Sequence, residues 1–220
     1  MKKSIFIFIA TVGLISCKLH NKSKQNEVSV ETLSSEKKVQ NDIDLYSKNE
    51  YTDFNGNQII IENGYPRGGI KYTDTKGNVY SYVVFWTRIN NKTDNPLELN
   101  FDLPINSYKI SNLPGKYFKV LVPAYNILPG KIPLINHTTL KSFLDTNIDK
   151  PSSFKRMINP NETSGFYSIM LILTLEGTGM VRTELSLKGQ NLFYKILRYS
   201  KTTLIDEKEI HCGTINFKKV

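Results

Sequence analysis

The chain has 220 residues, of which 29 are lysine or arginine and 20 are aspartate or glutamate, giving a formal net charge of +9 at pH 7. This length suits one folded domain with a tail. The positive excess favours anionic surroundings such as lipid headgroups or acidic polysaccharide. Nucleic acid is not expected as a partner, because no basic helix or clustered basic motif accompanies the charge.

The first 17 residues have the parts of an export signal. Two lysines follow the initial methionine, and residues 5–15 form an uncharged apolar run. The run is shorter than the roughly 20 residues that span a bilayer, and it fits the hydrophobic region of a signal peptide. It leads into Leu-Ile-Ser-Cys at residues 14–17. This ending resembles the lipobox of bacterial lipoprotein signal peptides, in which the chain is cut before a cysteine that carries acyl chains such as palmitate.

The lipobox resemblance implies where the chain is processed and held. It implies a signal peptide over residues 1–16, cleavage between Ser16 and Cys17, and lipid attachment at Cys17. Several acyl chains on one residue anchor a protein more firmly than one chain does. Lys18 follows the cysteine in place of the aspartate that retains some lipoproteins in the inner membrane. We therefore expect an outer-membrane anchor with the domain facing the periplasm.

After the anchor, the sequence predicts a tether and then a domain. Residues 17–50 interleave charges of both signs with few aromatic residues, which predicts a flexible tether. Residues 51–220 predict a domain of about ten short strands separated by turn residues. The predicted strands cover residues 58–62, 68–73, 79–90, 97–103, 117–122, 165–176, 180–188, 191–199, 202–205 and 214–218.

Two predicted strands carry the most information about the core. Residues 79–90 are apolar on both alternating faces, which predicts a central strand covered on both sides. Residues 97–103 alternate leucine or phenylalanine with Glu98, Asn100 and Asp102, which predicts one buried and one polar face. We expect these two strands to pair as a hairpin, and residues 165–176 and 180–188 to form another.

The connection between residues 123 and 162 has five prolines and exceeds the usual loop length. Thr139 is positioned to cap one short helix at residues 140–145. The connection is either a crossing between sheets or a functional loop. Residues 87–91 and 159–162 loosely resemble immunoglobulin-like bacterial modules. The predicted fold is mainly β: a single immunoglobulin-like antiparallel β-sandwich with one short helix in the long Pro-rich connection.

The sequence gives no specific catalytic or metal-binding pattern. His137 lacks a strained nucleophile turn near Ser142. His211 and Cys212 are adjacent, and on a strand their side chains point to opposite faces. With Cys17 acylated, Cys212 has no intrachain partner, and we expect a buried thiol in a terminal strand. Ser152 and Lys155 match Ser-x-x-Lys without its companion motifs. No cofactor and no metal are predicted.

Aromatic residues are the remaining candidates for a site. The chain has 12 tyrosines and one tryptophan. Tyr80, Tyr82 and Trp86 share one face of the predicted central strand, and Tyr125 lies in the Pro-rich connection. These side chains would form either a weak ligand or partner surface, as in sugar-binding modules, or part of a sandwich core.

Three functions remain open from the sequence. The first is a non-catalytic lipoprotein that binds a protein or polysaccharide of the cell envelope, with residues 123–164 as the contact surface. The second is a hydrolase of envelope or dietary glycans, using carboxylates such as Glu98, Asp102 or Glu184. Such an enzyme needs a carboxylate pair about 5–10 Å apart in an aromatic cleft. The third is a purely structural spacer, which would have no concave site.

Overall fold

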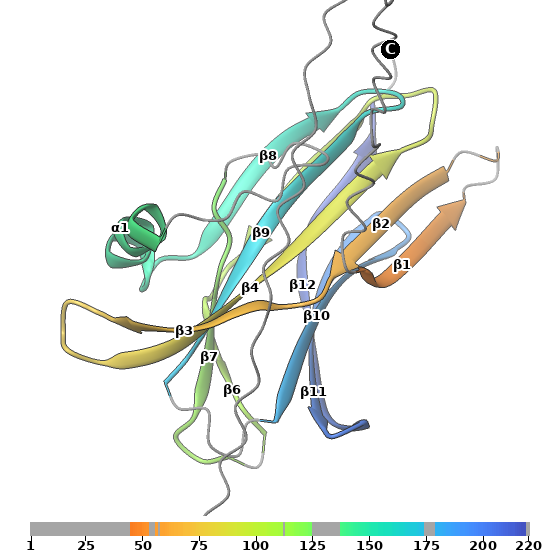
Figure 1. The fold of residues 1–220 in the computed structure, drawn as a ribbon. Coiled ribbons are helices and arrows are strands. Elements are labelled where there is room, and N and C mark those ends of the chain that lie inside the picture. Colours follow the sequence, from red (N-terminus) through yellow and green to blue (C-terminus); the bar gives the residue numbers. More distant parts are fainter. Residues whose placement is uncertain are drawn as a thin grey trace, which may run out of the picture. The chain divides into compact units, whose positions relative to one another are not determined.

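The computed structural model describes residues 45–52, 56, 58–111, 113–124, 137–173 and 179–218. Within these residues it has twelve β-strands and one α-helix (Figure 1). The predicted signal peptide, residues 17–44 of the predicted tether and Tyr125 lie outside the described residues. The strands are β1 (Leu45–Thr52), β2 (Gln58–Gly64), β3 (Arg67–Thr73), β4 (Val79–Asn91), β5 (Leu97–Leu103), β6 (Ser107–Lys109), β7 (Tyr117–Leu121), β8 (Ser152–Ile158), β9 (Thr163–Ile172), β10 (Met180–Lys188), β11 (Asn191–Ser200) and β12 (Thr203–Phe217), and the helix is α1 (His137–Asn147).

The strands form two antiparallel sheets. In the large sheet the order is β1-β2-β4-β9-β7-β6, and β3 pairs with the first half of β4. In the small sheet the order is β10-β11-β12-β5-β8. Buried apolar residues from both sheets form one core cluster between them. The prediction of a mainly-β antiparallel sandwich with one short helix is therefore confirmed. We call the face of each sheet that is turned away from this core its outer face.

β4 is the central strand of the large sheet and is covered on both faces. On one side it pairs with β3 and β2 in turn, and on the other side with β9. Phe85 and Ile89 lie in the core between the sheets. Tyr80 and Tyr82 belong to a second buried cluster, which they form with Leu140 and other residues of α1. The predicted two-sided burial is confirmed, and α1 supplies the second cover.

The predicted pairing of β4 with β5 is wrong, although the faces of β5 are as predicted. The exposed fraction is at most 1% for each of its apolar residues, Leu97, Leu99, Phe101 and Leu103. The chain crosses from the large to the small sheet between β4 and β5. β9 and β10, also predicted as a hairpin, lie in different sheets as well. A neighbouring strand in the same sheet pairs with the backbone of a strand, but it does not cover the apolar face. That face is covered only by a strand of the facing sheet, which is where the next strand of the chain lies in both cases.

Two further differences concern strand boundaries. Residues 202–205 and 214–218, predicted as separate strands, are the two ends of β12. β5 pairs only with residues 213–217 of β12, so the charged middle of the strand stays exposed and has no apolar alternation. β8 lies within the Pro-rich connection and pairs along β5. The connection is thus in part a strand of the small sheet.

β1 corrects the predicted tether boundary at residue 50. Its first six residues fall within the predicted tether, yet five of them pair with β2 and Tyr46 lies at a register shift. Two side chains of β1 reach the edge strand β10 of the small sheet. Asn49 Nδ2 donates to Glu184 at 2.6 Å, and the hydroxyl oxygen of Tyr51 accepts from the Leu187 amide at 3.0 Å. The polar side chains that suggested a tether are hydrogen-bond partners in the fold.

Asn63 of β2 forms a buried link between the two sheets. Its side chain is buried, and its Oδ1 accepts from the Leu185 amide at 2.9 Å and from the Thr87 hydroxyl at 3.1 Å. Its Nδ2 donates to the Leu185 carbonyl at 3.3 Å and to Ser47 at 3.1 Å. Buried backbone groups need hydrogen-bond partners. The side chain of Asn63 therefore provides the backbone of Leu185, at the edge of β10, with the hydrogen bonds that a further strand would provide.

The substitution Asn63→Ala tests this link. It leaves the buried amide and carbonyl of Leu185 without their side-chain partner, so we expect the free energy of unfolding to fall by about 3 kcal/mol. Denaturant unfolding measures the change. Asn216→Ala is the matched control, since Asn216 is half-buried and its side chain donates to Thr214 within the small sheet. Similar losses for the two variants would contradict the role of Asn63.

Candidate partner-binding surface

The predicted aromatic platform on β4 is buried. Tyr80, Tyr82 and Trp86 share the outer face as predicted, but their exposed fractions are 9%, 4% and 4%. Trp86 lies directly over Gly64, where a Cβ would come within 1.9 Å of the indole nitrogen. The guanidinium of Arg88 stands 5.0 Å from the Trp86 ring centre. These residues are therefore core residues and not an exposed platform, because a central strand has both faces covered.

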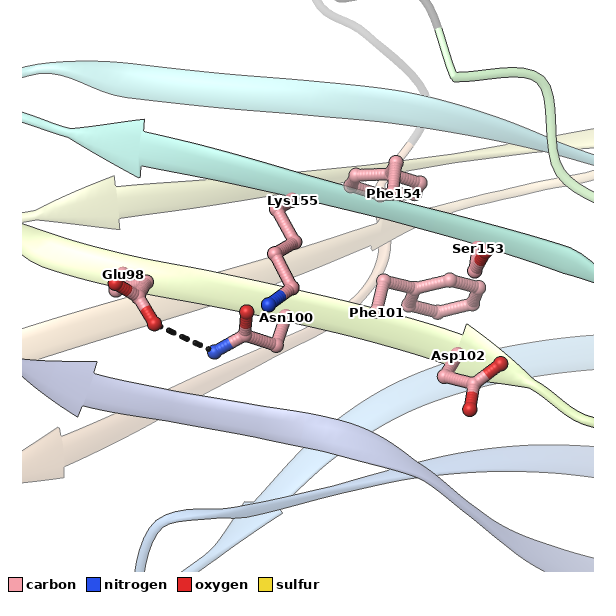
Figure 2. A pocket seen from close by; sticks show the side chains of 7 residues that line it. All are labelled: Glu98, Asn100, Phe101, Asp102, Ser153, Phe154 and Lys155. Carbon is pink, nitrogen blue, oxygen red and sulfur yellow. Dashed lines mark hydrogen bonds between the residues drawn. The ribbon is translucent and has the colours of Figure 1, made fainter.

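The carboxylates proposed for a hydrolase do not converge. Glu98 and Asp102 line one hollow of about 480 Å³ on the outer face of β5 and β8 (Figure 2). They are four residues apart on one strand, a Cα spacing of about 13 Å. Figure 2 shows Asn100 between Glu98 and Lys155, with Asp102 farther along the strand. Glu184 lies on β10 at the opposite edge of the small sheet, where it accepts a hydrogen bond from Asn49.

The partners of Glu98 hold it as a structural carboxylate. It accepts from Lys218 at 2.7 Å and from Asn100 at 3.1 Å. The hydrogen bond from Lys218, followed by that from Asn100, lowers the pKa of Glu98. A glycosidase needs one carboxyl group with a raised pKa to serve as the acid. Glu98 is shifted in the opposite direction.

The remaining nucleophile and histidine candidates are also separated. Ser152 is buried and accepts from the Val122 amide at 2.9 Å, whereas Lys155 is exposed on the other face of β8. His211 is exposed and Cys212 is fully buried, which confirms that they point to opposite faces. Burial raises the pKa of the Cys212 thiol well above its usual value. Across the described part of the chain, no three potential metal ligands lie together.

The structure brings together an aromatic and cationic cluster that the sequence analysis missed. The rings of Tyr46 and Tyr65 meet edge to face with centres 5.6 Å apart. The guanidinium of Arg182 lies 5.1 Å from the Tyr65 ring centre and 6.0 Å from that of Tyr46. The hydroxyl oxygens of Tyr46 and Tyr199 are 3.0 Å apart. Edge-to-face rings and a stacked guanidinium are both attractive arrangements.

Irregular backbone places these four side chains together. Tyr46 sits at a register shift in β1, and Tyr199 beside a shift between β11 and β12. Tyr65 lies at the junction of β2 and β3, before Pro66. Arg182 lies on β10, the strand that Asn63 joins to the large sheet. The cluster therefore depends on the contact between β1, β2 and β10.

Apolar side chains extend the cluster over the surface. Tyr65 is 42% exposed, and the neighbouring Leu45 and Met180 are 39% and 45% exposed. Met180 stands opposite Tyr199 on the paired strand. We call these residues the Tyr65 patch: Leu45, Tyr46, Tyr65, Met180, Arg182 and Tyr199. Burial and the bond to Tyr199 raise the pKa of Tyr46.

The residues of the Tyr65 patch come from three strands (β1, β10 and β11) and from the β2–β3 junction, which is why no local motif reveals them. Tyr46 also fell within the predicted tether. The only available signal was the presence of two tyrosines, Tyr46 and Tyr65, close to turn or tether residues, where a core role is not expected.

Comparison with protein-family models, curated proteins and solved structures gives no match. In the described residues, no helix combines the length and the apolar character of a membrane span.

Intrinsic fluorescence tests the burial of Trp86, the single tryptophan of the chain. We expect blue-shifted emission that acrylamide quenches little, and a red shift with loss of stability in Gly64→Ala, because the new Cβ displaces the ring. Gly189→Ala is the control: a Cβ there meets nothing within 4 Å, and its φ of 62° costs only about 1–2 kcal/mol. Strong quenching of the native protein would place Trp86 at the surface.

Proposed function

We propose that this chain is a lipid-anchored, non-catalytic protein of the bacterial cell envelope that binds another envelope component through the Tyr65 patch. The signal and lipobox pattern at residues 1–17 supports the anchor, at the outer membrane facing the periplasm. The exposed ring of Tyr65, next to the half-buried Arg182, Tyr46 and Tyr199, carries the binding proposal. The patch includes the first residues of β1, where the predicted tether joins the domain.

The composition of the Tyr65 patch favours a protein as the bound component. Tyrosine, methionine and arginine are enriched in protein interfaces, and tyrosine and arginine dominate their binding energy. The ring of Tyr65 also offers a surface on which a sugar could stack, so a polysaccharide is the second candidate. Neither the hydrolase nor the spacer requires an exposed tyrosine ring next to an arginine.

The patch replaces residues 123–164 as the proposed contact surface. In the described part of that stretch, α1 buries its apolar side chains against the outer face of the large sheet. β8 pairs along β5 and contributes Phe154 and Ile158 to the core. These elements are structural parts of the domain, so their side chains are used within the fold.

Substitution of Cys17 tests the anchor. We expect Cys17→Ala to move the protein from the membrane to the soluble fraction, or to leave an uncleaved precursor, because the acylated thiol is removed. Fractionation and mass determination of the product give the answer. Normal processing and unchanged membrane association would overturn the lipobox interpretation.

Purification of the lipidated protein from its own membranes in mild detergent tests the binding surface. We expect a stoichiometric companion that is lost in the double variant Tyr65→Ala/Arg182→Ala. Two such residues at the centre of an interface contribute about 2 kcal/mol or more each, so the affinity should fall at least about 100-fold.

The matched control for this purification is Ile70→Ala/Lys155→Ala, which removes an exposed apolar side chain and a cation elsewhere on the domain. The control should retain the companion. Equal retention by both double variants would remove the Tyr65 patch as the binding surface. A wild-type protein that purifies alone would exclude a stable protein partner and leave the polysaccharide.

A further inference from the structure

One end of the sandwich brings together the tips of two hairpins, β6–β7 and β11–β12 (Figure 1). The backbone of Ser111 joins them. Its amide donates to Asp206 at 3.3 Å, and its carbonyl accepts from Arg198 at 3.1 Å. The two tips are therefore held as one surface, although they belong to different sheets.

Exposed apolar side chains gather at this end. Tyr117 begins β7 and Leu173 follows the end of β9, and they are 41% and 48% exposed. Leu204 and Ile205 lie near the start of β12 and are 45% and 42% exposed. At the opposite end of the domain, the described loops at residues 92–96, 159–162 and 189–190 have no exposed large apolar side chain. Beside these loops, Met157 near the end of β8 is 45% exposed, so the opposite end has fewer exposed apolar side chains than this one.

Uncompensated lysines accompany these apolar side chains. Lys201 lies in the β11–β12 turn, Lys109 two residues before Ser111, and Lys208 two residues after Asp206. All three are exposed, and none forms an ion pair with a described residue. The carboxylates of this end have partners of their own: Asp206 lies 3.6 Å from Arg198, and Glu207 lies 3.6 Å from Lys195.

We propose that this end, which we call the Lys201 end, docks on the anionic surface of a lipid membrane. Amphipathic surfaces bind there by placing apolar side chains between the headgroups and cations beside the lipid phosphates. Both kinds of side chain are present at the Lys201 end. We propose a membrane as the partner because of charge complementarity: three uncompensated lysines match a negatively charged lipid surface.

This inference rests on the proposed anchor, which would keep the domain near the membrane. A chain of the length of residues 18–44 with the flexibility that the sequence predicts has a root-mean-square span of about 30 Å. A tethered domain meets the surface at a high effective concentration, so a contact that is weak in solution is sufficient. The Tyr65 patch adjoins the Lys201 end, since Tyr199 stands opposite Leu204. Docking would therefore fix the height of the patch above the bilayer.

Vesicle sedimentation tests the inference without the anchor. The mature chain carrying Cys17→Ser, produced without the signal peptide, is mixed with vesicles of phosphatidylcholine alone or with phosphatidylglycerol. We expect binding to the phosphatidylglycerol vesicles that weakens as salt is raised. Each lysine near such a surface strengthens binding about fivefold. Lys109→Glu/Lys201→Glu/Lys208→Glu should therefore lose at least about 100-fold, and Ile205→Ser should also bind less.

The matched control is Lys71→Glu/Lys92→Glu/Lys155→Glu, which changes the net charge equally at three exposed lysines away from the Lys201 end. Both triple variants should keep the wild-type unfolding temperature. Equal loss in the control, or equal binding to both vesicle types, would overturn the proposal. So would a wild-type chain that ignores vesicles and uses the same lysines to bind an anionic polysaccharide. Failed vesicle binding with normal processing at Cys17 would refute the docking and leave the anchor intact.

Discussion

The outward edge of β10 is the constraint on which the rest of the structure depends. A sheet must end somewhere, and the backbone groups of its last strand need partners when they are buried. Here Asn63 and Tyr51, from the large sheet, bind the amides of Leu185 and Leu187. These bonds join the sheets along one side, make β1 part of the domain, and bring Tyr46 and Tyr65 against Arg182. The Tyr65 patch is thus a consequence of how the small sheet ends.

The outer faces of the two sheets differ in what covers them. On the large sheet, α1 buries the tyrosines of β4, which removes them from the surface. On the small sheet, cross-strand ion pairs such as Lys188 with Glu209 occupy the outer face. Exposed pairs of this kind add about 0–1 kcal/mol each to stability, yet they keep that face polar. Exposed aromatic and apolar side chains are left mainly at the Tyr65 patch and the Lys201 end. This distribution is the basis for assigning binding to those two surfaces.

The sequence predicted local properties well and non-local ones poorly. The faces of β5, the two-sided burial of β4, and the burial of Cys212 each follow from alternation along a single strand. Which strands pair depends on contacts between distant segments. The connections after β4 and β9 contain the turn residues typical of hairpins, although the chain crosses to the other sheet at both. β1 was missed because its side chains are polar, and their partners on β10 lie more than 100 residues away. The Tyr65 patch combines three strands, the β2–β3 junction and two register shifts, and a one-dimensional pattern contains no information on how these come together.

Site-specific photo-crosslinking in living cells tests the central claim, that the Tyr65 patch holds an envelope partner, most directly. A photoreactive amino acid replaces Tyr65 in one strain and Ile70 in another. Ile70 is 47% exposed on β3, outside the patch. We predict one discrete cross-linked species from position 65 and none from position 70. The same species from both positions, or none from position 65 when the protein is at the membrane, would contradict the assignment of binding to the patch.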